Sequence, residues 1–350
     1  LDALAADYSS IMWTTSGSGS FNDPTAIDPV YTPSQNDIDD GFVILSLTAY
    51  GNGSCTDAVD NMTLSITAQA TAYAGADASI CETTNSYTIA DALATDYSSL
   101  LWTTAGDGSW DDASLQNPTY TIGPGDVAAG MVDLVITAFP NGSCAPVSHT
   151  MTLFISLQPN VFAGPDDEIC ETQTSYALAF ATAGNYTSIQ WTTDGTGTFD
   201  DPTAVNPVYF PSTSDIQDGQ VRLSVTAYGD GICPDVNDEM LLTIWHIADV
   251  FAGIDATICE GEDYQLWDAN AQYYTDLQWT TSGDGSFDNP AELNPVYTPG
   301  PADIAAGSVV LTLTATSEGV CPPVSDDMTL SITAAPTVFA GDDAEICETD

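Results

Sequence analysis

The sequence has no lysine, and Arg222 is its only side chain with a permanent positive charge. Against this one cation stand 50 aspartates and glutamates, for a formal net charge of −49. Such a charge repels nucleic acid and anionic membrane surfaces, so we expect neither as a partner. The lack of lysine also excludes Schiff-base catalysis, a lysine-bearing phosphate loop and lysine–asparagine crosslinks.

Histidine is almost as scarce, with only His149 and His246. A Ser-His-Asp or Cys-His site would need one of them, and neither recurs or accompanies a matching nucleophile motif. A histidine-rich zinc site is excluded on the same ground. Apolar runs are too short to span a bilayer, so we expect no membrane insertion. The sequence therefore predicts that the chain is not an enzyme.

Hydrophobic residues make up 43% of the chain, enough to form cores despite the charge. Self-comparison shows that these residues recur in a repeated unit. The tripeptide Trp-Thr-Thr begins at Trp13, Trp102, Trp191 and Trp279, at spacings of 89, 89 and 88 residues. Each copy continues with a glycine pair and an aromatic residue, then N-P-x-Y or D-P-x-Y, then D-I-x-x-G or D-V-x-x-G. The chain is therefore a tandem array.

The predicted domains are an incomplete repeat at 1–67 that lacks its first strand, complete repeats at 68–156, 157–245 and 246–334, and the first strand of a further repeat at 335–350. We call the first four the first to fourth repeats. Two explanations of the ends stay open. The chain is a piece of a longer array, or residues 336–350 complete the first repeat of another copy by adding a β-strand.

Alternating polar and apolar residues, with turns rich in Gly, Pro, Asn and Asp, fill each repeat. Strands are predicted in the second repeat at 77–82, 86–92, 99–104, 108–111, 117–122, 131–138 and 149–156. The D-I-x-x-G segment predicts one helical turn. Short antiparallel strands at this spacing predict an all-β fold, a tandem array of immunoglobulin-like β-sandwiches, with Trp102 buried.

The glycine pair, Gly17 and Gly19 in the first repeat, resembles part of a phosphate-binding loop. A phosphate loop leads into a helix, whereas an aromatic residue and then Asn-Asp-Pro follow here. Because the pair recurs in all four repeats, we interpret it as a turn that needs positive φ angles.

Eight cysteines, two per repeat, favour disulfides in an oxidising extracellular setting. The preferred pairing lies within each repeat: Cys81–Cys144, Cys170–Cys233 and Cys259–Cys321, with Cys55 and Cys347 bonded outside the segment or to a neighbouring chain. Two alternatives stay open. The opposite ends of an immunoglobulin fold would bring Cys81 closer to Cys233 of the next repeat, and Cys55–Cys81 is the pair closest in sequence.

Recurring acidic residues are the best candidates for ligand binding. One set follows the aromatic residue: Asp111, Asp112, Asp200, Asp201 and Asp288. A second set lies at the junctions between repeats: Asp77, Asp166, Asp167, Asp255 and Asp342. Carboxylate oxygens suit Ca²⁺, but aspartate at a turn is also a common capping residue, so both explanations stay open. Four sequons, at Asn52, Asn61, Asn141 and Asn185, permit attached glycans.

Taken together, A-G-x-D-x-x-I-C-E, W-T-T-x-G-x-G-x-F-x-D-P and N-P-x-Y-T-P resemble the tandem immunoglobulin-like or PKD-like repeats of very large secreted proteins of Bacteroidota. This resemblance covers the whole chain. It implies a cell-surface adhesin or filament, often exported by the type IX system, and no catalytic residues. We therefore expect a structural protein of the cell surface whose partners are neighbouring repeats or copies of itself. A carbohydrate- or protein-binding array is the alternative.

Overall fold

The computed structural model describes residues 2–343 and residue 345. Contacts divide the chain into two compact units, one made of residues 1–158 with 230–234 and the other of residues 159–229 with 235–350. The first and second repeats lie in the first unit. The third and fourth repeats lie in the second unit, except that loop 230–234 of the third repeat belongs to the first unit.

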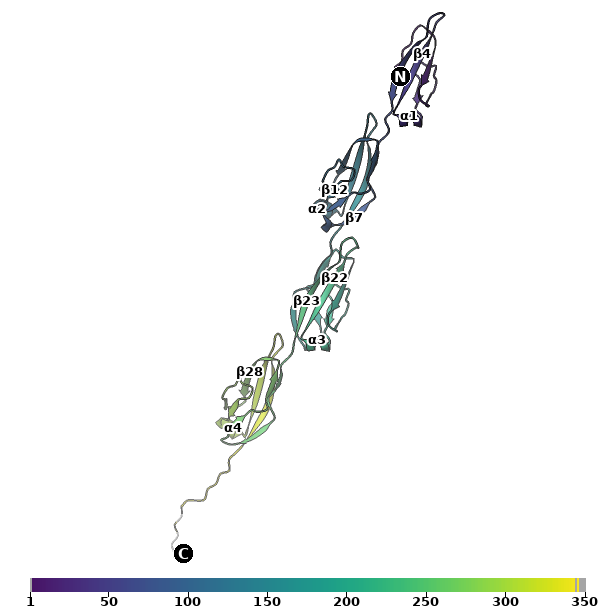
Figure 1. The fold of residues 1–350 in the computed structure, drawn as a ribbon. Helices are drawn as coiled ribbons and strands as arrows, with labels where there is room; N and C mark the ends of the chain where they lie inside the picture. Colours follow the sequence, from purple (N-terminus) through teal and green to yellow (C-terminus); the bar gives the residue numbers. More distant parts are fainter. Residues whose placement is uncertain (1, 344, 346–350) are drawn as a thin grey trace. The chain divides into compact units, whose positions relative to one another are not determined.

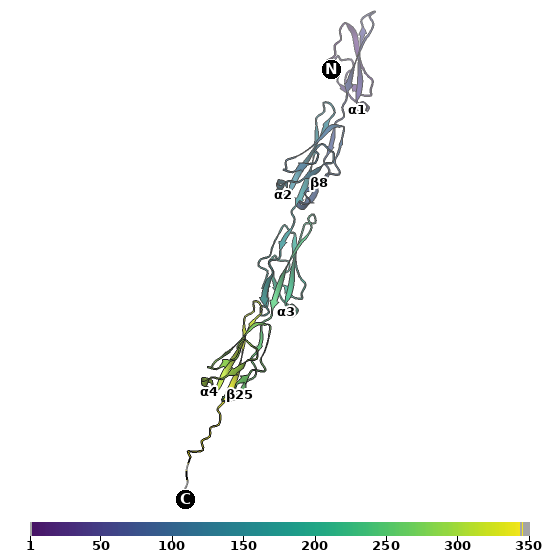
Figure 2. The ribbon, with the colours of Figure 1, turned by 60° about the vertical axis from the view of Figure 1, so that its left-hand side comes forward.

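The second repeat is a β-sandwich (Figures 1 and 2). One sheet has the order β10 (Tyr97–Thr104), β13 (Met131–Pro140), β14 (Val147–Ser156) and β7 (Ala78–Cys81). Strand β7 runs parallel to β14, and the other pairs are antiparallel. The facing sheet has the order β11 (Ser109–Trp110), β12 (Thr119–Thr121) and β8 (Ser86–Thr88), and β6 (Thr71–Tyr73) pairs with β9 (Leu93–Thr95). The predicted immunoglobulin-like fold class is confirmed.

The third and fourth repeats have the same three sheets. In the third, these are β19 (Ser188–Thr193), β22 (Gln220–Tyr228), β23 (Val236–Trp245) and β16 (Asp167–Cys170); β17 (Tyr176–Ala177), β21 (Val208–Phe210) and β20 (Thr198–Phe199); and β15 (Asn160–Phe162) with β18 (Thr182–Gly184). In the fourth, they are β28 (Tyr274–Thr281), β31 (Ser308–Ser317), β32 (Val324–Thr333) and β25 (Ala256–Cys259); β26 (Tyr264–Gln265), β30 (Val296–Thr298) and β29 (Ser286–Phe287); and β24 (Asp249–Phe251) with β27 (Asn270–Gln272).

The first repeat has fewer strands. Its main sheet has the order β1 (Tyr8–Thr15), β4 (Phe42–Gly51) and β5 (Ala58–Ser65), and β2 (Ser20–Phe21) pairs with β3 (Tyr31–Thr32). Among the described residues, no strand pairs with the outer edge of β5, where the other repeats carry a parallel strand. In the described residues the main sheet of this repeat therefore ends at β5.

Each sandwich packs around its tryptophan. Trp102, Trp191 and Trp279 are fully buried, as predicted for Trp102. In the third repeat the Trp191 ring lies 5.9 Å from that of Phe199, which lies 5.0 Å from the ring of Tyr209. Tilted rings at these distances add to the stabilisation from burial alone.

The predicted helical turn is a short helix in every repeat: α1 (Gln35–Asp40), α2 (Pro124–Ala129), α3 (Thr213–Asp218) and α4 (Pro301–Ala306). Each lies at one end of its own sandwich (Figure 1). Helix α3 begins after Ser212, whose hydroxyl accepts from the N–H of Asp215, and ends at Gly219 with φ of 72°. A left-handed glycine at this position satisfies the last carbonyls of the helix.

The third helical residue is a buried aspartate in all four repeats, namely Asp37, Asp126, Asp215 and Asp303. In the third repeat, Asp215 Oδ2 accepts from Tyr209 Oη at 2.7 Å and from the N–H of Ser212 at 2.8 Å, while Oδ1 accepts from the N–H of Thr196 at 2.9 Å. One carboxylate therefore joins the glycine turn, the helix and the buried tyrosine.

This carboxylate explains the glycine pair and corrects its interpretation. The four pairs are absent from the positive-φ residues of the described chain, so the expected positive φ angles are wrong. The glycines are needed for close approach instead. A Cβ on Gly195 would lie 2.2 Å from Asp215 Oδ1, and one on Gly197 would lie 2.4 Å from Tyr209 Oη. The turn does bind an anion, but that anion is the chain's own carboxylate.

Hydrogen bonding lowers the pKa of Asp37, Asp215 and Asp303. For Asp215, burial opposes ionisation, but hydrogen bonds from Ser212, Tyr209 and Thr196 outweigh it and lower the pKa. For Asp37, hydrogen bonds led by the Ser34 N–H lower the pKa to about 2. Because the pKa in the unfolded chain is about 3.9, this stabilisation is present above about pH 4 and is lost as pH falls through the folded pKa.

We therefore predict that Asp215→Asn lowers the free energy of unfolding of the third repeat by about 2 kcal/mol at neutral pH, since an amide nitrogen replaces an acceptor facing N–H groups. The variant should also lose the part of the wild-type stability that disappears as pH falls below about 4, the pKa of an aspartate in the unfolded chain. Hydrogen exchange of the full chain, read in the third repeat, measures both effects. Asp218→Asn is the control, because it removes an exposed charge from the same helix. Equal effects of the two substitutions would contradict the role of Asp215.

Candidate functional site at the repeat junctions

Two disulfides join the second repeat to the third and the third to the fourth. In the first compact unit, Cys81 at the end of β7 bonds to Cys233 in loop 230–234, with Cα atoms 4.9 Å apart. In the second unit, Cys170 at the end of β16 bonds to Cys321 in the loop between β31 and β32, also with Cα atoms 4.9 Å apart. All four cysteines are buried. Each bond therefore runs from the parallel strand of the four-stranded sheet in one repeat to the loop between the two long strands of the following repeat.

The preferred pairing within repeats, Cys81–Cys144, Cys170–Cys233 and Cys259–Cys321, is wrong. Cys81 lies beside Ser156 at the end of β14, whereas Cys144 lies in the loop where that strand begins. A strand of ten residues separates two such points by about 33 Å, far beyond the reach of a disulfide. The alternative Cys81–Cys233 is the observed bond, and Cys55–Cys81 is excluded because Cys81 is already bonded. Cys55, Cys144 and Cys259 are free, and Cys347 lies outside the described residues.

The glutamate that follows each junction cysteine closes the linker between repeats. Glu82 Oε1 accepts from the N–H of Gln158 at 2.8 Å, and Glu171 Oε1 accepts from the N–H of Ile247 at 3.0 Å. In the fourth repeat, Glu260 Oε2 accepts from the N–H of Ala335 at 3.2 Å. In the second and third repeats the I-C-E motif thus combines a disulfide to the following repeat with a hydrogen bond to its own linker.

The junction between the third and fourth repeats has additional contacts. His246 Nδ1 lies 2.8 Å from Glu171 Oε2, and its ring lies 4.6 Å from that of Tyr273. Trp245 Nε1 donates to Glu168 Oε2 at 2.6 Å. The second histidine, His149, accepts at Nδ1 from the N–H of Ala74 at 3.2 Å. Both histidines therefore have packing and hydrogen-bonding partners.

The acidic candidates for calcium accept hydrogen bonds from the backbone. Asp111, Asp200 and Asp288 each accept at 2.8 Å from the N–H of a residue eight positions later. Asp77, Asp166 and Asp255 each accept at 2.8 Å from the N–H of the neighbouring strand, at Thr152, Leu241 and Thr329. Asp112 and Asp201 cap turns, Asp167 accepts from Tyr176, and Asp342 is exposed. In the described part of the chain, no three carboxylate, histidine or cysteine side chains gather closely enough to hold an ion.

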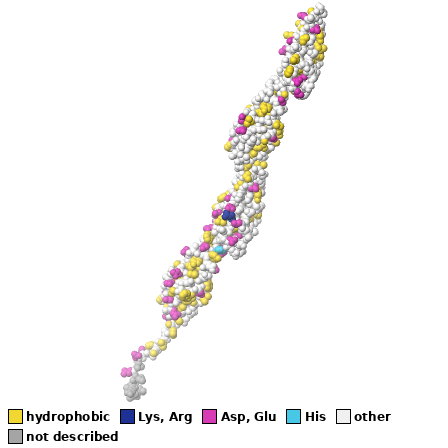
Figure 3. Space-filling model, in the orientation of Figure 1, with side chains coloured by type: hydrophobic (Ala, Val, Ile, Leu, Met, Phe, Trp, Pro, Cys, Tyr) yellow, Lys and Arg dark blue, Asp and Glu magenta, His cyan; other side chains and the backbone are white. Residues whose placement is uncertain are grey.

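The one arginine, Arg222, pairs with Glu239 on the neighbouring strand. Acidic side chains are spread over the visible face, with the single basic side chain among them (Figure 3). The four sequon asparagines, Asn52, Asn61, Asn141 and Asn185, are exposed. No helix in the described ranges has the length and apolar character needed to cross a membrane.

No protein-family model matches the chain, and no curated protein sequence does. Solved structures with similarity include an I-band fragment of titin, 13% identical over 77% of this chain and 99% of that one, with a TM-score of 0.46. Sidekick-1 immunoglobulin domains 1–4 are 12% identical over 93% of this chain and 90% of that one, with a TM-score of 0.36. Domains 3–6 of protocadherin gamma B2 are 13% identical over 95% of this chain and 93% of that one, with a TM-score of 0.35.

We predict that reduction of the two disulfides frees the junctions but leaves the cores folded, because both bonds lie outside the tryptophan clusters. After reduction and alkylation, hydrogen exchange should accelerate in loop 230–234 and in residues 157–159, while protection of β13 and β22 is retained. Non-reducing peptide mapping provides the control by identifying the Cys81–Cys233 and Cys170–Cys321 peptides. Loss of core protection on reduction would contradict the prediction.

The calcium hypothesis makes a separate prediction. If Ca²⁺ bound at the acidic turns, excess chelator would lower the Tm of the chain, and added Ca²⁺ would restore it. Mg²⁺ at the same ionic strength is the control, since it screens repulsion among the carboxylates without matching the same coordination. A Tm that does not respond to chelator would contradict calcium binding.

Proposed function

We propose that the chain is a load-bearing structural segment of an extracellular bacterial repeat protein, the stalk of an adhesin or a surface filament. The observation that carries this proposal is the bonding of each disulfide across two successive repeats. A bond of this kind keeps neighbouring cores joined when the linker between them is pulled.

The disulfides and the negative charge of the chain support an extracellular location. Disulfides persist outside the cytoplasm, and a charge of −49 keeps an exposed repeat protein soluble. Each repeat has its own core and contacts its neighbours through short junctions, so added copies extend the array without a new fold. The partners of each repeat are the adjoining repeats and further copies of the chain. Attached glycans and export by the type IX system belong to the same proposal through the resemblance to Bacteroidota proteins.

A second candidate function rests on exposed aromatic residues that differ between repeats. Trp267 in the fourth repeat is 79% exposed, and the corresponding residue of the third repeat is alanine. Exposed tryptophan rings stack on sugars and pack into protein pockets, so this position favours a carbohydrate- or protein-binding surface. Loss of a glycan-array or protein ligand in Trp267→Ala, with the fold intact, would favour this alternative.

Stretching single chains tests the load-bearing role. The two disulfides close overlapping loops with sequence separations of 152 and 151 residues. While they are intact, the pulling force passes through these bonds, and much of the second, third and fourth repeats cannot be extended. We expect unfolding peaks in oxidising buffer and, after reduction, an increase in extended length of roughly 600 Å at 3.3–3.6 Å per residue. The same extended length with and without reductant, or extension without force peaks, would contradict the proposal.

A further inference from the structure

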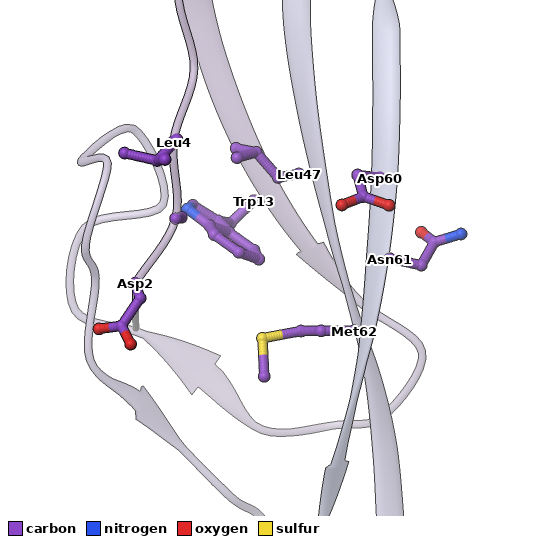
Figure 4. Close-up of a pocket in the computed structure, with 8 residues that line it drawn as sticks. Asp2, Leu4, Trp13, Leu47, Asp60, Asn61 and Met62 are labelled. Carbon is purple, nitrogen blue, oxygen red and sulfur yellow. The ribbon is translucent and has the colours of Figure 1, made fainter.

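The junction between the third and fourth repeats contains a tryptophan that lies outside the cores. In the first repeat, by contrast, Trp13 belongs to the core and lines a cavity of about 520 Å³ with Leu47 and Met62 (Figure 4). Trp245, the last residue of β23, packs on a loop of the fourth repeat, since a Cβ on Gly319 would lie 2.2 Å from its Cδ1 atom. This ring therefore brings the end of the third repeat against the fourth.

The next residue, His246, contacts both repeats. Its Nδ1 atom lies 2.8 Å from Oε2 of Glu171 in the third repeat. Its ring lies 4.6 Å from that of Tyr273 in the fourth repeat, at a tilt of 40°. The side chains of His246 and Glu171 are 25% and 26% exposed, so salt screens their interaction less than that of a surface pair. One imidazole ring thus connects a carboxylate of one repeat to an aromatic ring of the next.

The Glu171 carboxylate is held in position by the backbone. Its Oε1 atom accepts from the N–H of Ile247 at 3.0 Å, and the N–H of Glu171 donates to the carbonyl of Trp245 at 2.9 Å. The residue before it, Cys170, is bonded to Cys321 of the fourth repeat. The partner of His246 is therefore in place before any change in the charge of the ring.

Tyr273 has a backbone conformation that suits other residue types better. Its φ of 55° lies in the left-handed region. The residues at the same position of the other repeats are Asp7, Asp96 and Asn185, with φ of 59°, 54° and 56°. Aspartate and asparagine tolerate this region, whereas a bulky aromatic residue is disfavoured in it. The contact with the His246 ring gives a physical reason for a tyrosine at this position.

The junction between the second and third repeats has the same glutamate without the histidine. Glu82 accepts from the N–H of Gln158 at 2.8 Å, as Glu171 does from Ile247. The residue at the position of His246 is Leu157, which has no group to protonate. The two junctions therefore share a disulfide and a glutamate hydrogen bond, and they differ in whether the ring beside the glutamate can gain a charge.

The other ionisable groups of this junction are acidic. Glu168 on β16 accepts from the indole N–H of Trp245, and the N–H of Glu318, after β31, donates to the carbonyl of Tyr273 at 3.3 Å. Asp249 begins β24, shortly after the histidine. The single arginine of the chain forms its own ion pair between β22 and β23. In the described part of this junction, a positive charge on the histidine thus meets carboxylates and no other cation.

Protonation strengthens both contacts of the ring. In neutral histidine, Nδ1 donates to Glu171 only in the tautomer that carries its proton on that atom. The protonated ring has an N–H on both nitrogens, so it always donates, and the hydrogen bond becomes a charge-assisted one. The positive charge is also attracted to the electron-rich face of Tyr273. Because one ring makes both contacts, the gain of one proton acts on both repeats.

We infer that Glu171, His246 and Tyr273 form a pH-sensitive switch, in which proton uptake by His246 couples the third repeat more tightly to the fourth and proton loss weakens this coupling. Histidine gains its charge between about pH 8 and pH 5. The added stabilisation is therefore complete at the acidic end of this range and is lost as pH rises through it. This inference goes beyond the proposed load-bearing role, because it gives one junction a response to acidity that the preceding junction lacks.

Hydrogen exchange of the full chain tests the switch. The N–H of Ile247 reports on the junction with the histidine, and the N–H of Gln158 is the matched reporter at the junction without it. Each measured rate is compared with the intrinsic rate at the same pH, so that only protection is compared. Between about pH 8 and pH 5.5, we expect the protection of Ile247 to rise about fivefold, because a neutral hydrogen bond becomes charge-assisted. The protection of Gln158 should stay constant.

Substitutions separate the switch from a purely structural role. His246→Leu introduces the residue of the preceding junction and should abolish the pH response of Ile247. Glu171→Gln keeps an acceptor for the Ile247 N–H but removes the negative charge, so it should abolish most of the response. Tyr273→Asn introduces the residue of the third repeat and should reduce the response. An unchanged response in Tyr273→Asn would overturn the place of the tyrosine in the switch.

The control is His149→Asp, which removes the other histidine of the chain. The corresponding residues of the third and fourth repeats are Asp238 and Asp326, which accept the same backbone hydrogen bond that His149 accepts from Ala74. The variant therefore keeps an acceptor in the second repeat, and the response of Ile247 should equal that of the wild-type chain.

Constant protection of Ile247 in the wild-type chain overturns the inference. An equal rise at Gln158, or a rise that persists in His246→Leu, also overturns it, because the titration of carboxylates would then explain the response. The stretching experiment compares extended lengths with and without reductant at a single pH, so its result does not depend on the histidine. Failure of the switch is thus distinguishable from failure of the load-bearing role.

Discussion

The buried aspartate at the third position of each short helix is the interaction on which every sandwich depends. In a chain with almost no cations, Asp215 is stabilised by N–H and O–H dipoles rather than by a salt bridge. Burial raises the pKa of its partner Tyr209 to about 12, so the hydroxyl keeps the proton that it donates. The carboxylate fixes the turn after the tryptophan strand, the start of the helix and the tyrosine over the core. Both sheets are thereby held in register at one end.

Much of the fold could be predicted because periodicity reports which face of a strand is buried. The long strands near 99–104, 131–138 and 149–156, the helical turn and the buried Trp102 follow from alternation and capping chemistry. The pairs β6–β9, β15–β18 and β24–β27 were missed because three residues are too few to show a period. The reason for the glycines was missed because their neighbour, an aspartate such as Asp215, lies about twenty residues further along the chain.

The junctions were harder to predict than the cores. Cysteine spacing does not show at which end of a strand a sulfur lies, and that position excludes Cys81–Cys144. The recurrence of aspartates does not by itself distinguish a metal site from a structural turn. Asp166 and Asp200 accept hydrogen bonds from backbone N–H groups, and the sequence does not show which N–H groups lie beside them.

The overlap of the two disulfides has a consequence for survival among extracellular proteases. The Cys81–Cys233 bond closes a loop of the chain that ends in the third repeat. The loop closed by Cys170–Cys321 starts within the first loop, so the two loops share residues 170–233. Any single peptide bond cut between Cys81 and Cys321 is therefore bridged by at least one disulfide. A nicked chain stays covalently continuous there, and only a second cut or a reductant separates the pieces. Crosslinking the second repeat to the third and the third to the fourth thus makes backbone damage tolerable.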